Sequence, residues 1–165
     1  MSLQPVFDIV NFFVEIMMVI GYPGAFLAGF LGAQYFPSWF VIPFLGRTLE
    51  PLFVGILAGI GAGLGQFLHY YIGVGGRWLA PRYKTERLDV WKRRLKRHGA
   101  LLVFIFAVSP LTVDDLVWIP IGIIGYSKIK ALGAVIIGKV LLNLAYAYTG
   151  ALGLPILEEM IQGFV

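Results

Sequence analysis

Apolar residues fill most of the chain, and glycines, prolines and short polar groups divide them into segments. Over residues 4–20 the polar side chains Asp8, Asn11 and Glu15 recur at spacings of three and four, which places them on one face of a helix. We therefore predict an amphipathic helix here, ending at the breaking sequence 21–24. This helix is short for a membrane crossing, so it either lies in the interface or packs its polar face against the other helices.

Two later segments have the length and apolarity of membrane-spanning helices. Residues 51–76 contain no charged side chain, and Gly55, Gly59 and Gly63 repeat at every fourth position, a spacing that lets two helices approach closely in a membrane. Residues 131–152 form the second such segment and carry Lys139 and Asn143. We predict that both segments cross the membrane and that 153–165 is a tail.

Two further apolar runs, 22–46 and 99–126, are interrupted near their middles. The first is broken at Pro37 and the second at Pro110, so each arm keeps only about ten residues, half of the 20 or so that a crossing helix needs. Each run is therefore predicted to enter the membrane, turn at its proline and return. Such a segment is a re-entrant helical hairpin.

The composition agrees with an integral membrane protein. Hydrophobic residues make up 59% of the 165-residue chain, charged residues only 13%, and the mean hydropathy is +0.83, which is too apolar for an ordinary soluble domain. The 21 glycines lie mostly within the long apolar runs, which suits closely packed helices better than the alternating pattern of a β-barrel. We expect a single all-α membrane domain over residues 1–165.

Basic residues are concentrated in one segment. Nine of the 13 Lys and Arg lie between Arg77 and Arg97 with only two acidic residues, so this segment carries +7 and the rest of the chain −3. The positive-inside rule then predicts that 77–98 is cytoplasmic in a multi-pass protein of the cell membrane. Such a segment also attracts anionic lipid headgroups, whereas its short length beside membrane helices argues against nucleic-acid binding.

This orientation relates the two hairpins to each other. If 77–98 is cytoplasmic, the helix at 51–76 begins outside, so the hairpin at 22–46 enters from outside and the hairpin at 99–126 from the cytoplasm. The predicted fold is an inverted repeat of two re-entrant hairpins, each followed by a transmembrane helix. Secondary transporters use such repeats to build a substrate site near the midplane, because irregular backbone at membrane depth must line protein or water.

Two adjacent carboxylates, Asp114 and Asp115, follow the second hairpin proline inside an apolar run. One ionised side chain at the bilayer centre costs roughly 2.5–3.5 kcal/mol, so the pair needs partners. We predict that it faces Lys139, with Asn143 one helical turn further on, and that Thr112 and Asp114 cap the re-entering helix. Two carboxylates against one ammonium can hold a proton or a cation. A structural salt bridge is the alternative, and capping alone would account for one of the two carboxylates.

Other kinds of chemistry have little support. The chain has no cysteine, His69 and His98 lack zinc-binding spacing, and motifs for a nucleophile elbow or a phosphate loop are missing. We therefore expect no enzyme activity, no metal and no cofactor. Gln66, His69 and Tyr70 lie towards the cytoplasmic end of their helix, where the two interpretations are interfacial anchoring with helix contacts, or a proton-carrying role for His69.

Three features in order match a known family over about residues 22 to 150: a hairpin with Phe-Pro at its tip, a Gly-rich crossing that ends in Gly-Arg, and a second proline hairpin. They stand here as Gln34-Tyr35-Phe36-Pro37, Gly61-Ala62-Gly63-Leu64-Gly65, Tyr70-Tyr71-Ile72-Gly73, Gly76-Arg77 and Pro110. The chain thereby resembles the DedA superfamily, also called the VTT or SNARE-associated Golgi protein family. That resemblance implies two re-entrant hairpins and movement of phospholipids or polyprenyl-phosphate lipids between leaflets, with proton or sodium coupling in some members and scrambling in others.

Two departures from the bacterial family pattern bear on the substrate. That pattern has an acidic residue where Gln34 stands and arginines where Ala107 and Val113 stand, so the arginine clamp for a phosphate is missing here. The P-x-x-x-D-D hairpin and the pair Gly138-Lys139 instead resemble archaeal and YqaA-like members. This likeness implies Lys139 as the cation for a headgroup phosphate and the Asp pair as the site of the coupling ion.

The expected binding site lies between the two hairpin tips, with Gln34 and Pro37 on one side and the Pro110 hairpin on the other. The leading hypothesis is a flippase or scramblase of phospholipid or polyprenyl-phosphate lipid. An ion or small-solute transporter with the same cavity is the alternative, and a structural membrane protein without transported substrate is the third. A homo-oligomer is compatible with each of them.

Overall fold

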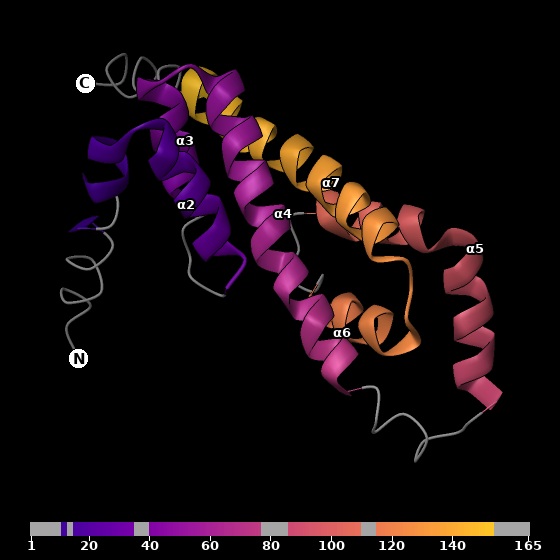
Figure 1. The fold of residues 1–165 in the computed structure, drawn as a ribbon. Coiled ribbons are helices and arrows are strands. Elements are labelled where there is room, and N and C mark those ends of the chain that lie inside the picture. Colours follow the sequence, from indigo (N-terminus) through magenta and orange to yellow (C-terminus); the bar gives the residue numbers. More distant parts are fainter. Residues whose placement is uncertain (1–10, 13–14, 35–39, 77–85, 110–114, 154–165) are drawn as a thin grey trace, which may run out of the picture.

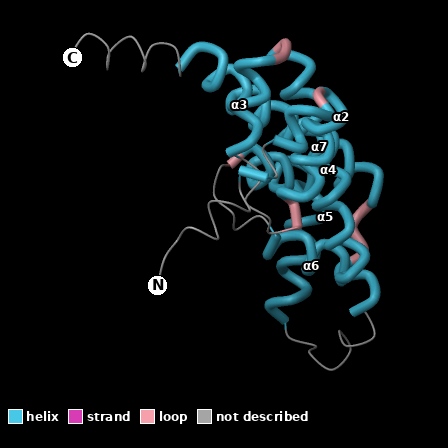
Figure 2. The backbone as a smooth tube through the Cα atoms, turned by 90° about the vertical axis from the view of Figure 1, so that its left-hand side faces the viewer, coloured by secondary structure: helices cyan, strands magenta, loops and turns pink. Residues whose placement is uncertain are grey.

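The computed structural model describes residues 11–12, 15–34, 40–76, 86–109 and 115–153, and its regular structure over those ranges is entirely helical. Figure 1 shows the helices in chain order, and Figure 2 shows from the side that they form one elongated bundle. They are α2 (Tyr22–Gly32), α3 (Val41–Thr48), α4 (Pro51–Gly75), α5 (Glu86–Val108), α6 (Asp115–Ile124) and α7 (Lys128–Tyr148), which continues into the π-helical turn η4 (Thr149–Gly153). The predicted all-α class is confirmed for these residues.

Two glycines set the breaks between neighbouring helices. Gly21 has a φ of 70° and separates the N-terminal helical residues from α2, while Gly125 has a φ of 74° and ends α6. A residue with a side chain is strained in this left-handed region of the backbone, whereas glycine adopts it readily. Pro23 lies in the first turn of α2, where its missing N–H removes no helical hydrogen bond.

The two predicted crossing segments are the two helices of the described chain that are long and apolar enough to span a membrane, Pro51–Gly75 and Lys128–Gly153. They lie side by side and antiparallel (Figure 1). Each step of four residues forward along α4 meets a residue four positions earlier on α7. The contacts pair Gly55 with Leu144, Gly59 with Val140 and Gly63 with Ile136. The glycine repeat is therefore the packing face that its spacing predicted.

The chain has two halves, one ending with α4 and one beginning with α5, and α2 and α5 each pack on the long apolar helix of their own half. Helix α2 lies on α4, where Gly29 contacts the backbone of Ala58, and α5 lies on α7, where Gly138 contacts Ala107. In both contacts a glycine brings the two helices close, because a Cβ atom at either position would collide with the neighbouring helix. The two halves thus use the same kind of contact.

The second short helix of each half packs on the crossing helix of the other half. Helix α3 lies on the end of α7 and on η4, where Gly150 contacts the backbone of Pro43. Helix α6 lies on the end of α4, where Gly122 contacts the backbone of Tyr70. The halves are therefore interlocked at both ends of the α4–α7 pair.

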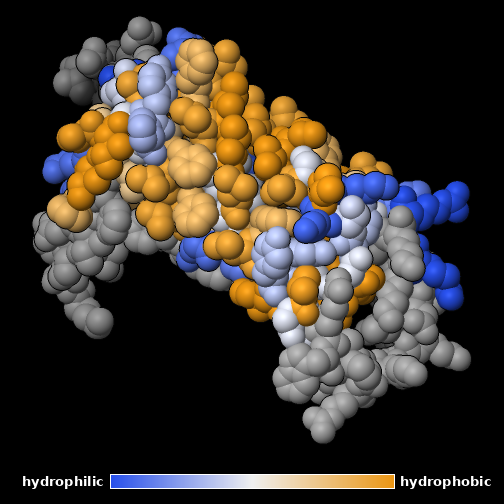
Figure 3. All heavy atoms as spheres, viewed as in Figure 1, coloured by the Kyte–Doolittle hydropathy of each residue, from blue (hydrophilic) through white to orange (hydrophobic). Residues whose placement is uncertain are grey.

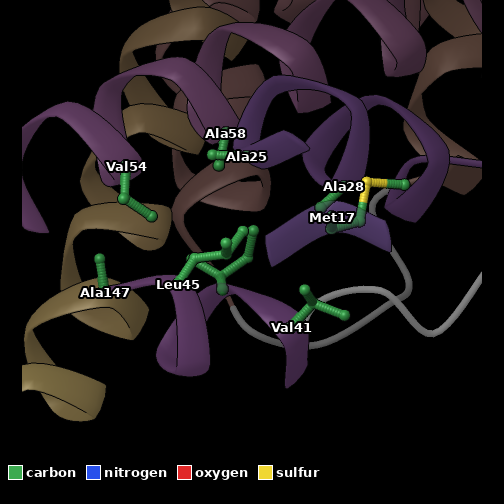
Figure 4. Close-up of a cluster of buried hydrophobic side chains, with 9 residues drawn as sticks. Met17, Ala25, Ala28, Val41, Leu45, Val54, Ala58 and Ala147 are labelled. Atoms are coloured by element: carbon green, nitrogen blue, oxygen red, sulfur yellow. The ribbon is translucent and has the colours of Figure 1, made fainter. Parts of the chain in front are cut away.

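Two apolar clusters hold these ends. The first joins the start of α4 and the end of α7 to α2 and α3, and Figure 4 shows its side chains converging between those helices. The second joins the end of α4 and the start of α7 to α5 and α6. Their largest fully buried side chains are Ile42 and Leu45 in the first cluster and Trp118 and Ile121 in the second.

Helix α5 differs from the predicted arrangement. The sequence pattern predicted a basic segment, 77–98, followed by a separate hairpin arm that begins at 99. In the structure, one helix runs from Glu86 to Val108. Good helix formers fill its first part, and Gly99 is retained inside the helix because it lies against the ring of Tyr126. Helix α7 likewise begins three residues before the predicted start at 131. The hairpin tips at Pro37 and Pro110 and the tail from 154 lie outside the described residues.

We predict that Gly59→Ala destabilises the protein by about 1–3 kcal/mol, the usual cost of overpacking, because the new Cβ would overlap the backbone of Val140. The matched control is Gly133→Ala on α7, where an added Cβ meets nothing within 4 Å and helix propensity favours alanine by about 1 kcal/mol. Chemical unfolding in detergent micelles measures both. Equal stability of the two variants would contradict the assigned α4–α7 contact.

Candidate functional site

Lys139 lies on the inner face of α7. Val135 and Asn143, one turn before and one turn after it, are both buried, whereas Ile137 and Leu141 on the opposite face are more than 45% exposed. The residues beside Lys139 in the sequence contact different neighbours, because Gly138 meets α5 and Val140 meets α4. Lys139 itself is half-buried. Its side chain therefore leaves α7 on the face enclosed by α4 and α5.

Asn143 is positioned directly beside Lys139. It is 6% exposed, and its Nδ2 donates a hydrogen bond of 2.8 Å to the backbone oxygen of Lys139. A buried amide needs such a partner, because an unmade hydrogen bond in the interior costs about 1–3 kcal/mol. The predicted pairing of these two residues on one face is thus present, and it places an amide one helical turn beyond Lys139 on that face.

Two polar side chains of α4 are buried where the sequence favoured the membrane interface. Gln66 is 2% exposed and His69 is 7% exposed, so both are enclosed by protein, as the helix contacts of the first interpretation require. Gln66 lies three residues beyond Gly63, on the side of α4 that faces α7. His69 lies four residues beyond Gly65, so both side chains continue glycine-lined faces of α4, and this signal would have identified the two buried polar residues.

Tyr70 has the structural role that the helix-contact interpretation assigned to it. Its hydroxyl donates a buried hydrogen bond of 2.7 Å to the backbone oxygen of Tyr126, and its ring stacks on Phe67 at 5.3 Å between centroids. Phe67 also meets Trp118 of α6 edge to face. This group fixes α6 and the turn before α7 against the end of α4.

Gln34 ties the end of α2 to α4. Its Nε2 donates a hydrogen bond of 2.8 Å to the backbone oxygen of Gly65. An ionised carboxylate at this position has no hydrogen to donate, so the amide suits the contact where the bacterial family pattern has an acid. In the sequence, the predicted tip of the first hairpin begins directly after this anchored residue.

The remaining predicted site residues belong to the two predicted hairpins. Pro37, Pro110, Thr112 and Asp114 lie outside the described residues, and Asp115 begins α6 but its side chain is not among those described. The facing of the Asp pair towards Lys139 therefore stays a prediction. The described chain leads to that segment from beside Lys139, because Gly138 contacts Ala107 and the backbone of Val108 near the end of α5.

Two helices long and apolar enough to span a membrane, with the buried polar side chains Gln66, His69 and Asn143 on them, are features expected of a helical membrane protein. Residues 36–152 match the family model of the VTT domain. Because this match covers most of the chain, the protein belongs to the VTT-domain family, the DedA family, as its motifs suggested. No curated protein and no solved structure matches the chain.

We predict that Tyr70→Phe lowers the free energy of unfolding by about 1–3 kcal/mol, because it removes the donor to a buried carbonyl without changing the ring. Tyr71→Phe is the matched control, since Tyr71 is the next residue and is 52% exposed; surface changes of this kind stay within about 0.5 kcal/mol. Thermal unfolding in one detergent compares them. A loss of similar size in both variants would contradict the role given to the Tyr70 hydroxyl.

Proposed function

We propose that this protein moves lipids between the leaflets of the cell membrane, as a flippase or scramblase for phospholipid or polyprenyl-phosphate lipid. The observation that carries the proposal is the position of Lys139, on the inner face of a spanning helix and half-buried between α4 and α5. An ammonium group at membrane depth is costly, and intramembrane ionisable residues commonly mark a substrate path. A headgroup phosphate is an anion that a lysine in such a site binds strongly.

The short helices support a transporter with re-entrant hairpins. Helices α2, α3 and α6 contain 11, 8 and 10 residues, which span about 16, 12 and 15 Å, whereas the hydrocarbon core is about 30 Å thick. None of these three is long enough to cross. Each is held in the bundle by glycine contacts to a spanning helix, and such protein-enclosed backbone is tolerated at membrane depth.

The interlocked packing supports an inverted repeat. The crossing helices α4 and α7 are antiparallel, α2 and α5 take corresponding places on them, and α3 and α6 take corresponding places at opposite ends. This correspondence of helices is what two equivalent halves of opposite orientation in the membrane would have. In such transporters, the halves move against each other around a site between them. With 77–98 in the cytoplasm, the substrate site opens alternately to the two leaflets.

We assign the coupling ion to the second hairpin. In this proposal Asp114 and Asp115 face Lys139, Thr112 caps the re-entering helix, and the pair holds a proton or sodium ion when the headgroup phosphate is absent. The first hairpin tip, with Gln34 and Pro37, closes the opposite side. The lysine then exchanges its carboxylate partner for the phosphate during each transport cycle.

The direct test is reconstitution into liposomes with fluorescent phospholipid or polyprenyl phosphate in one leaflet. We expect leaflet exchange faster than in protein-free liposomes, and a change of rate when a proton or sodium gradient is imposed if the transport is coupled. Failure to exchange any of these lipids would refute the proposal. Solute or ion flux without lipid exchange would favour a small-solute transporter in its place.

The second test separates function from stability at the proposed site. We expect Asp114→Asn, Asp115→Asn and Lys139→Met each to reduce exchange about tenfold or more, the loss expected from removing one charge-assisted hydrogen bond. Arg47→Met is the matched control, because Arg47 is exposed at the end of α3 and should retain the native rate. Unchanged exchange with lowered stability in the three variants would show that the charges form only a structural salt bridge.

A further inference from the structure

A second group of basic side chains lies where α5 and α7 meet, away from Lys139. Arg97 on α5 and Lys128 and Lys130 in the first turn of α7 are all exposed. We call these three residues the α5–α7 basic surface. Figure 3 shows hydrophilic residues gathered over this end of the molecule, beside a broad hydrophobic surface.

Tertiary packing, not sequence, brings these residues together. Gly99 of α5 lies against the ring of Tyr126, so close that an added Cβ would be 2.6 Å from Cε2. Arg97 precedes Gly99 by two residues, and Lys128 follows Tyr126 by two residues. Tyr126 is itself 8% exposed and held by the hydrogen bond from Tyr70. The contact between Gly99 and Tyr126 therefore places the exposed Arg97 and the first turn of α7, with Lys128 and Lys130, at the same end of the bundle.

The charges at this surface are left without nearby carboxylates among the described side chains. The acidic side chains that the structure describes, Glu15 and Glu50, lie with the first apolar cluster at the other end of α4. The first turn of α7 contains no acidic residue, and the helix dipole disfavours cations such as Lys128 and Lys130 at that position. An anion bound here would offset both sources of repulsion.

One member of this surface, Lys128, is aligned with Lys139. Lys128 and Lys139 are eleven residues apart on α7, which is close to three full turns, so they share a face with an offset of about 20°. The rise between them is about 16 Å. An anionic headgroup at Lys128 would thus lie at the outer end of the same helix face whose middle carries Lys139.

We propose that the α5–α7 basic surface binds the phosphate of an anionic phospholipid headgroup at one membrane face and gives the protein a preference for anionic over zwitterionic lipid. The expected partner is a lipid because the surface borders the exposed apolar side chains Leu101 and Ile105 of α5, which acyl chains would cover. Its role in transport rests on the proposed function, whereas its lipid binding does not.

Retention of lipid by the purified full-length chain tests the binding. The protein is incubated with vesicles of phosphatidylglycerol or of phosphatidylcholine, extracted in mild detergent, and its bound lipids are counted by native mass spectrometry. We expect the triple variant Arg97→Gln, Lys128→Gln, Lys130→Gln to bind phosphatidylglycerol on the order of 100-fold more weakly, about five-fold for each charge removed near a membrane surface. Phosphatidylcholine binding should stay the same.

Two controls keep the result specific. Arg47→Gln removes one charge from the end of α3 and should retain native phosphatidylglycerol binding. The triple variant Arg97→Lys, Lys128→Arg, Lys130→Arg keeps every charge and should also bind as the native protein does. Native phosphatidylglycerol retention by the glutamine variant, or equal loss with Arg47→Gln, would overturn the proposal.

Leaflet exchange then connects the surface to transport. In liposomes, the glutamine variant should lose its preference for fluorescent phosphatidylglycerol and still exchange phosphatidylcholine, whereas Lys139→Met should lose both. If the native protein exchanges no lipid, the proposed function fails. The retention experiment then decides by itself whether the basic surface binds anionic lipid. If the native protein exchanges both lipids equally and the variant does too, the claimed preference is refuted.

Discussion

The close antiparallel contact between α4 and α7 is the constraint on which the rest of the structure depends. Between two helices surrounded by lipid there is no hydrophobic driving force, so van der Waals packing and hydrogen bonds must hold them together. Glycines at every fourth position of α4 bring the backbones close enough for that packing. Every other described helix rests on this pair. Helices α2 and α6 pack mainly on α4, α5 packs mainly on α7, and α3 packs mainly on the end of α7 and on η4.

This contact also determines where polar side chains can lie. Because α7 is held between α4 and α5, its inner face is enclosed at mid-helix, and Lys139 and Asn143 occupy that face. Gln66 extends the polar positions to the facing side of α4. The two apolar clusters fix the short helices at opposite ends, so the ionisable residue lies between two rigid regions. In the transport function proposed above, this arrangement would let a substrate path open at either end without disruption of the central pair.

Much of the element pattern was predictable from local signals. The charge-free run and its glycine repeat identified α4 and its packing face, and the second long run identified α7 to within three residues of its start. Spacing of four along one helix also predicted that Lys139 and Asn143 would be neighbours. Local signals failed at α5, because a run of charged helix formers and an apolar arm can continue as one helix when its single glycine is packed.

The sequence by itself determined the all-helical class, the break at Gly21 and the membership of the VTT-domain family, because these depend on residue type and spacing along the chain. Only the tertiary structure decided that α3 and α6 pack on the crossing helix of the other half, that Gln66 and His69 are buried, and that α5 contacts Tyr126 just before α7. In a helical membrane protein, nearly every helix face is apolar. Hydropathy therefore shows which segments form helices, but not which neighbour each helix face will meet.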